Sequence, residues 1–195
     1  FLTRRVADAI LMGEVNLPYP EQKKYFGGDG ADSDQLTLQF DFIGMQQIYL
    51  SMARSDARPI AKALRQRPTL DITSQWANFV RNHDELTLDK LSETERQEVF
   101  DAFGPDAGMQ LYGRGLRRRL PSMLGGDERR MRMVYSLAFS LPGTPVLFYG
   151  EEIGMVGDKP DELIRTPMQW DSTITGGFTT SRPWERLEMT YRKVN

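Results

Sequence analysis

Cysteine is absent from the 195 residues, and histidine occurs only once, at His83. The absence of cysteine excludes disulfide frameworks, thiolate nucleophiles and thiolate zinc sites, and a single imidazole leaves no histidine-based zinc site. The sequence has no apolar run as long as a membrane span and no basic-then-apolar leader at its start. We therefore expect a cytoplasmic protein that does not bind membranes and contains no metal site in this chain.

An excess of charge of either sign is also missing. The net charge is −2, with 27% charged and 39% hydrophobic residues, which is typical of a globular protein. This balance argues against binding to nucleic acid. Two stretches, 114–119 and 129–132, are rich in arginine. Arginine runs of this kind are usually solvated helix faces, and we predict that role for both.

Apolar runs alternate with helical patterns along the chain. We expect strands at 9–13, 36–40, 76–80 and 144–149, and helices at 41–52, 59–64 and 133–141, with Asp41 as a helix cap. Residues 90–126 are predicted to be a polar insertion that is helical in parts, and 153–184 an extended loop. The alternation predicts a parallel α/β sheet or barrel. Since a closed (β/α)₈ barrel takes about 250 residues, four strands indicate a small open sheet or part of a barrel.

Acidic residues follow three of the four expected strands. In a parallel barrel such residues meet at one mouth, where these folds carry their chemistry, and paired carboxylates with different pKa values are the machinery of glycoside hydrolysis. Each of them has an alternative role as a helix cap or a partner of arginine, and a lone histidine is more often structural than functional. The residues concerned are Glu14, Asp84, Glu151 and Glu152, and the candidates for a sugar-facing surface are Tyr149, Arg165, Trp170 and Phe178.

Four motifs cover the chain nearly end to end: Ile10-Leu-Met-Gly-Glu-Val-Asn16, Phe79-Val-Arg-Asn-His-Asp-Glu-Leu-Thr-Leu88, the segment from Phe139 to Met155, and Arg165-Thr-Pro-Met-Gln-Trp170. With them the chain resembles the α-amylase superfamily, glycoside hydrolase family 13. Residues 82–88 and Gly115-Leu-Arg-Arg-Arg-Leu120 are closest to the pattern of the trehalose synthases within that family.

The resemblance implies a role for six residues. Glu14 matches the general acid/base after the fifth barrel strand, and Asp84 matches the transition-state-stabilising carboxylate after the seventh. His83, Asn82 and Arg165 match substrate-binding positions, and Glu152 matches a glutamate of the eighth-strand motif that is more structural than catalytic. The resemblance implies no redox cofactor; calcium is possible in the complete enzyme but cannot be located in this chain.

The chain departs from the family pattern in two places. The family's nucleophilic aspartate lies in a Gly-x-Arg-x-Asp pattern after the fourth strand, and this pattern does not occur in the sequence. The resemblance therefore implies that residues 1–195 are strands five to eight of a (β/α)₈ barrel, with a helical insertion after the seventh strand. Segments 27–34 and 36–41 also differ from the trehalose synthase pattern. The spaced aspartates Asp29, Asp32 and Asp34 lack the ligand pattern of an EF-hand, and we expect a solvated turn there.

The function implied by the resemblance is retaining α-glucosyl transfer or isomerisation, maltose to trehalose, in the complete enzyme. Two alternatives stay open: hydrolysis by an α-glucosidase or α-amylase, and a non-catalytic sugar-binding or structural module. The expected ligands are small sugars such as maltose, trehalose and α-glucosides. The expected partner is the N-terminal half of the barrel or a second copy of the chain, and we expect the chain by itself to be inactive.

Overall fold

The computed structural model describes residues 5–6, 9–27 and 35–195, and Asp29, Asp32 and Asp34 lie outside these ranges. The chain divides into two compact units. Unit 1 comprises residues 1–79 and 138–146, and unit 2 comprises residues 80–137 and 147–195. In the described part of the chain, no helix has both the length and the apolar character needed to cross a membrane.

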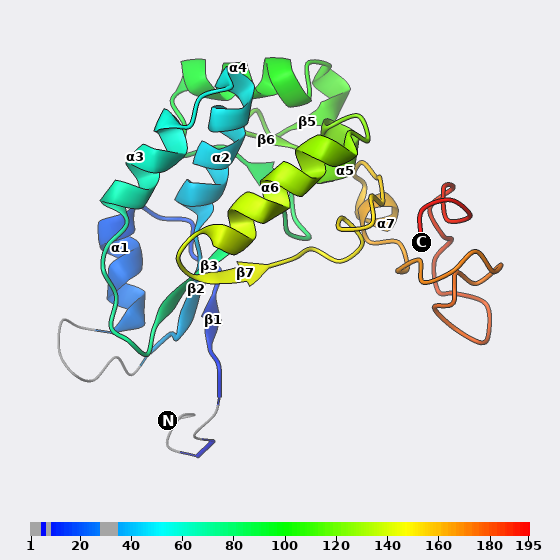
Figure 1. Ribbon diagram of the computed structural model, residues 1–195, viewed down its shortest axis with the longest axis horizontal. Helices are drawn as coiled ribbons and strands as arrows, with labels where there is room; N and C mark the ends of the chain where they lie inside the picture. Colours follow the sequence, from blue (N-terminus) through cyan, green and yellow to red (C-terminus); the bar gives the residue numbers. More distant parts are fainter. Residues whose placement is uncertain (1–4, 7–8, 28–34) are drawn as a thin grey trace. The chain divides into compact units, whose positions relative to one another are not determined.

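Unit 1 contains a parallel sheet whose strands are β1 (Met12–Gly13), β2 (Leu38–Phe40), β3 (Gln75–Phe79) and β7 (Thr144–Val146). They lie in the order β1-β2-β3-β7, with Leu38 opposite both Met12 and Gln75. Figure 1 shows this sheet from the blue β1 to the yellow β7. Each strand lies next to its neighbour in chain order with no reversal, as in a (β/α)₈ barrel, whereas a doubly wound sheet reverses its order at a switch point. The four predicted strands are present, but those expected at 9–13, 36–40 and 144–149 are shorter.

The crossovers of unit 1 are helical. The first contains α1 (Tyr19–Lys23) and the short helix η1 (Lys24–Phe26), and the second contains α2 (Phe42–Arg54) and α3 (Arg58–Gln66), which lie side by side (Figure 1). Asp41 is the N-cap of α2, as predicted: its carboxylate accepts a hydrogen bond of 2.8 Å from the backbone N–H of Gly44.

Aromatic residues from the strands and from both helical crossovers form the core of unit 1. The Trp76 ring lies edge-on to those of Tyr19 and Phe26, with centroids 5.4 and 5.2 Å apart. The Phe79 ring makes similar contacts with Phe40 and Phe42. Such edge-to-face pairs are favourable beyond the area they bury. They pack β3 against α1, η1 and α2, while its neighbours in the sheet are β2 and β7.

Unit 2 contains the segment predicted to be a helical insertion. Part of it is helical: α4 (Glu93–Phe103) begins with a capping box between Ser92 and Glu95, and α5 (Leu120–Met123) precedes α6 (Glu128–Ser140), whose last turn belongs to unit 1. The prediction missed a small antiparallel sheet of β4 (Leu86–Thr87), β6 (Gly115–Leu116) and β5 (Gln110–Leu111), with η2 (Ala107–Met109) before β5. Two-residue strands are too short to give an alternating pattern.

The prediction that residues 114–119 form a solvated face is wrong for most of the stretch. Arg119 is fully buried, and Arg117 and Arg118 are partly buried, while Arg114 is exposed. The three partly or fully buried guanidinium groups donate to backbone carbonyls, including those of Lys159, Phe103 and Ile164. Buried arginines are tolerated when their donors are satisfied in this way.

Candidate functional site

Glu14 follows β1 directly in unit 1 and is exposed. It is placed there by Gly13, where a Cβ atom would lie 2.3 Å from the Cδ1 atom of Leu36. A larger residue at this position would require the Leu36 side chain to move, and glycine avoids this. Glu14 therefore stands at the carboxyl end of a parallel strand, the edge at which such folds place reactive groups.

A second carboxylate of unit 1, Asp41, follows β2 in the same way but is buried, with 1% exposure. Tyr19 donates to its Oδ1 atom at 2.9 Å, and Arg67 makes an ion pair with its Oδ2 atom. Burial, followed by the charge of Asp41, raises the pKa of the Tyr19 hydroxyl far above its ordinary value. Because the Asp41 oxygens are occupied by these partners and by the cap of α2, this cluster serves the structure of unit 1.

The loop after β3 begins unit 2 and is built around Arg81, whose exposed fraction is 1%. Its Nε atom donates to the carbonyl of Arg118 at 2.8 Å, and its Nη1 atom donates to the carbonyls of Asn82 and Asp84. The Asn82 side chain is also buried, and its Oδ1 atom accepts from the N–H of Asp84 at 3.1 Å. Arg81 was not among the predicted site residues, because its carbonyl partners become apparent only in the folded loop.

The Asp84 carboxylate is half exposed, and two cationic or potentially cationic groups face it. The Nη2 atom of Arg165 lies 3.2 Å from its Oδ1 atom, and Nε2 of His83 lies 3.6 Å away. Arg165 also donates to the His83 carbonyl at 3.3 Å. Three of the predicted residues of unit 2 are thus brought together, with side-chain exposures of 47% for Asp84, 48% for His83 and 37% for Arg165.

Asp161, which the sequence reasoning missed, is a second anion for Arg165, with its Oδ2 atom also 3.2 Å from Nη2. It opens α7 (Asp161–Ile164) and accepts from the Lys159 ammonium at 2.9 Å. This hydrogen bond, with the charges of Lys159, Arg165 and His83, holds the pKa of the Asp161 carboxyl below its ordinary value. Arg165 therefore bridges two carboxylates, Asp84 and Asp161.

The two glutamates after β7 have opposite environments. Glu152 is exposed, whereas Glu151 is fully buried in unit 2. The Glu151 carboxylate lies 3.5 Å from the Nε atom of Arg119 and accepts from the Leu120 N–H at 2.9 Å and the Tyr135 hydroxyl at 3.2 Å. Burial raises the pKa of Glu151, opposed chiefly by Arg119. Of the two glutamates, Glu151 is therefore the one that is bonded into the core of unit 2.

The aromatic candidates of unit 2 also differ from one another. Trp170 and Phe178 are exposed, with fractions of 66% and 43%, and remain available for a ligand. The Tyr149 hydroxyl is engaged, because it donates to the carbonyl of Thr166 at 2.7 Å. Within each unit taken alone, the described residues bring no three carboxylate or imidazole ligand atoms together.

Sequence and structure comparisons give the relatives of the chain and the similarity of its fold. The α-amylase catalytic-domain family model matches residues 116–195. The trehalose synthase of Thermus thermophilus is 42% identical over 182 residues, or 91% of this chain and 18% of that protein. The trehalose synthase/amylase TreS of Mycolicibacterium smegmatis is 36% identical over 89% of this chain and 30% of that protein. The fold is similar to that of an α-amylase from H. orenii, with a TM-score of 0.55 and 24% sequence identity. The similarity covers 86% of this chain and 28% of the α-amylase chain.

The chain spans less than a third of the length of each of these relatives. The match extends over both units, since it covers about nine tenths of the 195 residues. The resemblance carried by the four sequence motifs and the similarity of the fold therefore point to the same group. The chain belongs to the α-amylase family.

Proposed function

We propose that the chain forms strands five to eight of a (β/α)₈ catalytic domain that cleaves α-glucosidic bonds with retention of configuration. The observation that carries the proposal is the half-exposed Asp84 carboxylate facing Arg165 and His83, in a chain 42% identical to a trehalose synthase. The sheet order supports the barrel, because β1, β2, β3 and β7 are parallel neighbours in chain order.

In this proposal Glu14 is the general acid/base. Its carboxyl group protonates the glycosidic oxygen as the bond to the anomeric carbon breaks, while a nucleophile from elsewhere in the protein bonds to that carbon. Glu14 then takes a proton from the incoming hydroxyl as the covalent bond is cleaved. Exposure and position at the end of β1 suit this role. The family's Gly-x-Arg-x-Asp nucleophile pattern does not occur in the 195 residues, so this chain contributes the acid/base and not the nucleophile.

Asp84 stabilises the positive charge that develops on the sugar ring in the transition state. His83 and Arg165 donate hydrogen bonds to sugar hydroxyls beside it, and the Arg165 guanidinium faces the carboxylate at 3.2 Å. Asn82 acts through the loop, since its Oδ1 atom already holds the N–H of Asp84. Glu152, although matched to a structural position, is exposed, and the adjoining buried Glu151 supports the fold.

The incoming hydroxyl decides the product. If it is the anomeric hydroxyl of the released glucose, maltose becomes trehalose; if it is water, the products are two glucose molecules. The two trehalose synthase relatives favour isomerisation. Hydrolysis is the second candidate, because one of these relatives is named a trehalose synthase/amylase. Exclusion of water from the closed site sets the ratio between them.

The test is to incubate the full-length protein with maltose and follow the anomeric protons by NMR. We expect trehalose as the main product and glucose as the minor one. Glu14→Gln should abolish both, whereas Glu21→Gln, which neutralises another exposed glutamate of unit 1, should have no effect. Glucose alone would identify a hydrolase. Binding of maltose without any turnover would favour the non-catalytic alternative.

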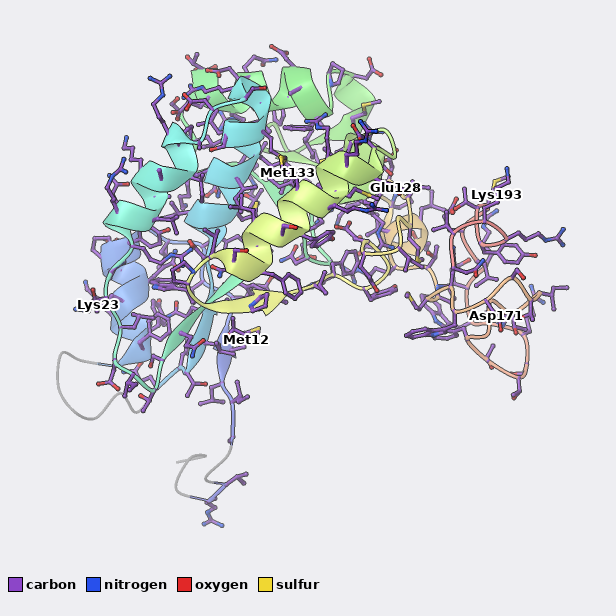
Figure 2. All side chains as sticks on the ribbon, in the orientation of Figure 1. Met12, Lys23, Glu128, Met133, Asp171 and Lys193 are labelled. Atoms are coloured by element: carbon purple, nitrogen blue, oxygen red, sulfur yellow. The ribbon has the colours of Figure 1, made fainter. Side chains whose placement is uncertain are left out.

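The outer strands of the sheet support a further part of the proposal, that another segment or chain covers them. Among the described residues, β1 and β7 each pair with one strand only. Met12 on β1 (Figure 2) and Leu147 after β7 are both exposed, with fractions of 45% and 41%. Apolar unpaired edges promote association. The 195-residue chain by itself should therefore self-associate in light scattering, and a monomer that binds no hydrophobic dye would contradict this.

A further inference from the structure

The backbone around Arg165 is held on both sides by side chains of unit 2. The residue before it, Ile164, has its carbonyl bonded at 3.1 Å by the Nη1 atom of Arg119. The residue after it, Thr166, has its carbonyl bonded at 2.7 Å by the Tyr149 hydroxyl. The two donors come from separate segments, the end of the arginine run and the segment after β7. The backbone carbonyls of the residues before and after Arg165 are thereby both held by side-chain donors.

The two donors also hold each other. Arg119 donates through Nη2 to the Tyr149 carbonyl, and its guanidinium lies 5.4 Å from the centre of the Tyr149 ring and 4.5 Å from that of Phe148. The buried Glu151 carboxylate faces Arg119 from 3.5 Å. A guanidinium that is fully buried, ion-paired and stacked in this way has little freedom to move. It is a rigid support for the Ile164 carbonyl.

The Arg165 side chain, in contrast, is 37% exposed. Its guanidinium contacts Asp84, the His83 carbonyl and Asp161. A long side chain with two competing anions adopts a single position only if its backbone is fixed. A displacement of about 1 Å in a catalytic arrangement can cost about 10²-fold in rate. How firmly the Arg165 backbone is held should therefore affect the reaction rate.

We propose that Arg119 and Tyr149 are positioning residues that fix Arg165 against Asp84, and that this is the role of the third arginine of the run 117–119. The proposal rests on the function proposed above for Asp84 and Arg165. Neither positioning residue needs to contact the sugar. They act through the carbonyls of Ile164 and Thr166.

A double-mutant cycle in the full-length protein tests the proposal. Tyr149→Phe removes the hydroxyl and keeps the ring that stacks on Arg119. We expect it to lower kcat/KM for maltose by about 10- to 100-fold, and to have less than about a twofold effect when Arg165 is already alanine. If the full loss persists without Arg165, Tyr149 acts on the sugar or on stability directly, and the proposal is wrong.

Two further variants separate positioning from stability. Tyr19→Phe removes a buried hydroxyl from Asp41 in unit 1, and should lower the unfolding temperature with kcat/KM within about twofold of the wild type. Arg119→Lys keeps the charge beside Glu151 but cannot reach both carbonyls. It should fold and resemble Tyr149→Phe in its kinetics and in its dependence on Arg165. Normal kinetics in a folded Arg119→Lys protein would overturn the role of Arg119.

A structural readout keeps this test independent of activity. In a crystal structure of the Tyr149→Phe protein, Arg165 should lie farther from Asp84 than the present 3.2 Å, while the Tyr19→Phe protein should retain that distance. If the wild-type protein converts no α-glucoside, the proposed function fails, and the two crystal structures still decide whether Tyr149 positions Arg165. An unchanged Arg165 in the Tyr149→Phe structure would contradict the positioning role.

Discussion

Asp41 in unit 1 and Asp84 in unit 2 both follow a strand of the parallel sheet, yet their surroundings differ completely. Asp41 has 1% exposure, and its oxygens are taken by Tyr19, Arg67 and the cap of α2. The Asp84 side chain is 47% exposed and faces the open side chains of Arg165 and His83. Position at the end of a strand is therefore shared by a structural carboxylate and by the one for which we propose a catalytic role. What separates them is whether their hydrogen-bonding capacity is already used.

The comparison predicts the largest loss of stability when the buried cluster is broken. Arg67→Met leaves the Asp41 carboxylate buried without its cation, and should lower the free energy of unfolding by about 3–5 kcal/mol. Chemical denaturation of the full-length protein, with amide exchange measured in α2, gives this value. The matched control is Arg132→Met, which removes an exposed ion pair with Glu128 on α6 (Figure 2) and should cost about 0.5 kcal/mol or less.

A loss below about 1 kcal/mol for Arg67→Met would mean that solvent or another group reaches Asp41, and the contrast with Asp84 would no longer hold.

The second prediction is that Asp84→Asn affects the rate and not the fold. Removing one preorganised electrostatic group typically lowers kcat by about 10²–10³, whereas a half-exposed carboxylate contributes about 0.5 kcal/mol or less to stability. Steady-state kinetics on maltose and a thermal unfolding curve of the full-length protein measure both. A variant with a normal rate, or one that does not fold, would give Asp84 the structural role of Asp41.

The smallest effect is expected at Asp161. Its folded-state pKa is depressed, by the Lys159 hydrogen bond first and by Arg165 and His83 after it, so its contribution to stability is present above the ordinary carboxyl pKa of about 3.9 and is lost as the pH falls through the lower folded value. Asp161→Asn should therefore be slightly less stable than the wild type near pH 7, and the difference should vanish in acid. A difference that grows as the pH falls would have the wrong sign.

The sheet was predictable from the sequence because its strands are apolar runs between helical patterns, and Asp41 was predictable as a cap because caps are local. The surroundings of Asp41 were not predictable, since Tyr19 and Arg67 lie 22 and 26 residues away along the chain. Arg119 was interpreted as solvated for the same reason: its partners Tyr149, Glu151 and Ile164 are distant in sequence. The sequence shows that a residue is charged, but it does not show which distant residues surround it in the fold.

Asp84 and Glu14 are predictable as site residues chiefly from the resemblance to the family. Their position after a strand is the physical support for that prediction. Asp161 had no comparable signal, because an aspartate after a proline is common at the first turn of any helix. The pairing of Glu151 and not Glu152 with Arg119 was equally hidden, since adjacent glutamates differ only in the direction in which the backbone turns them.

The central claim is that Glu14 transfers a proton and that Asp84 stabilises charge. It is tested most directly by comparing maltose with α-glucosyl fluoride, whose leaving group needs no proton. We predict that Glu14→Gln lowers kcat/KM for maltose by at least about 10² more than that for the fluoride, whereas Asp84→Asn lowers both to a similar extent. Equal losses on the two substrates for Glu14→Gln would contradict the account.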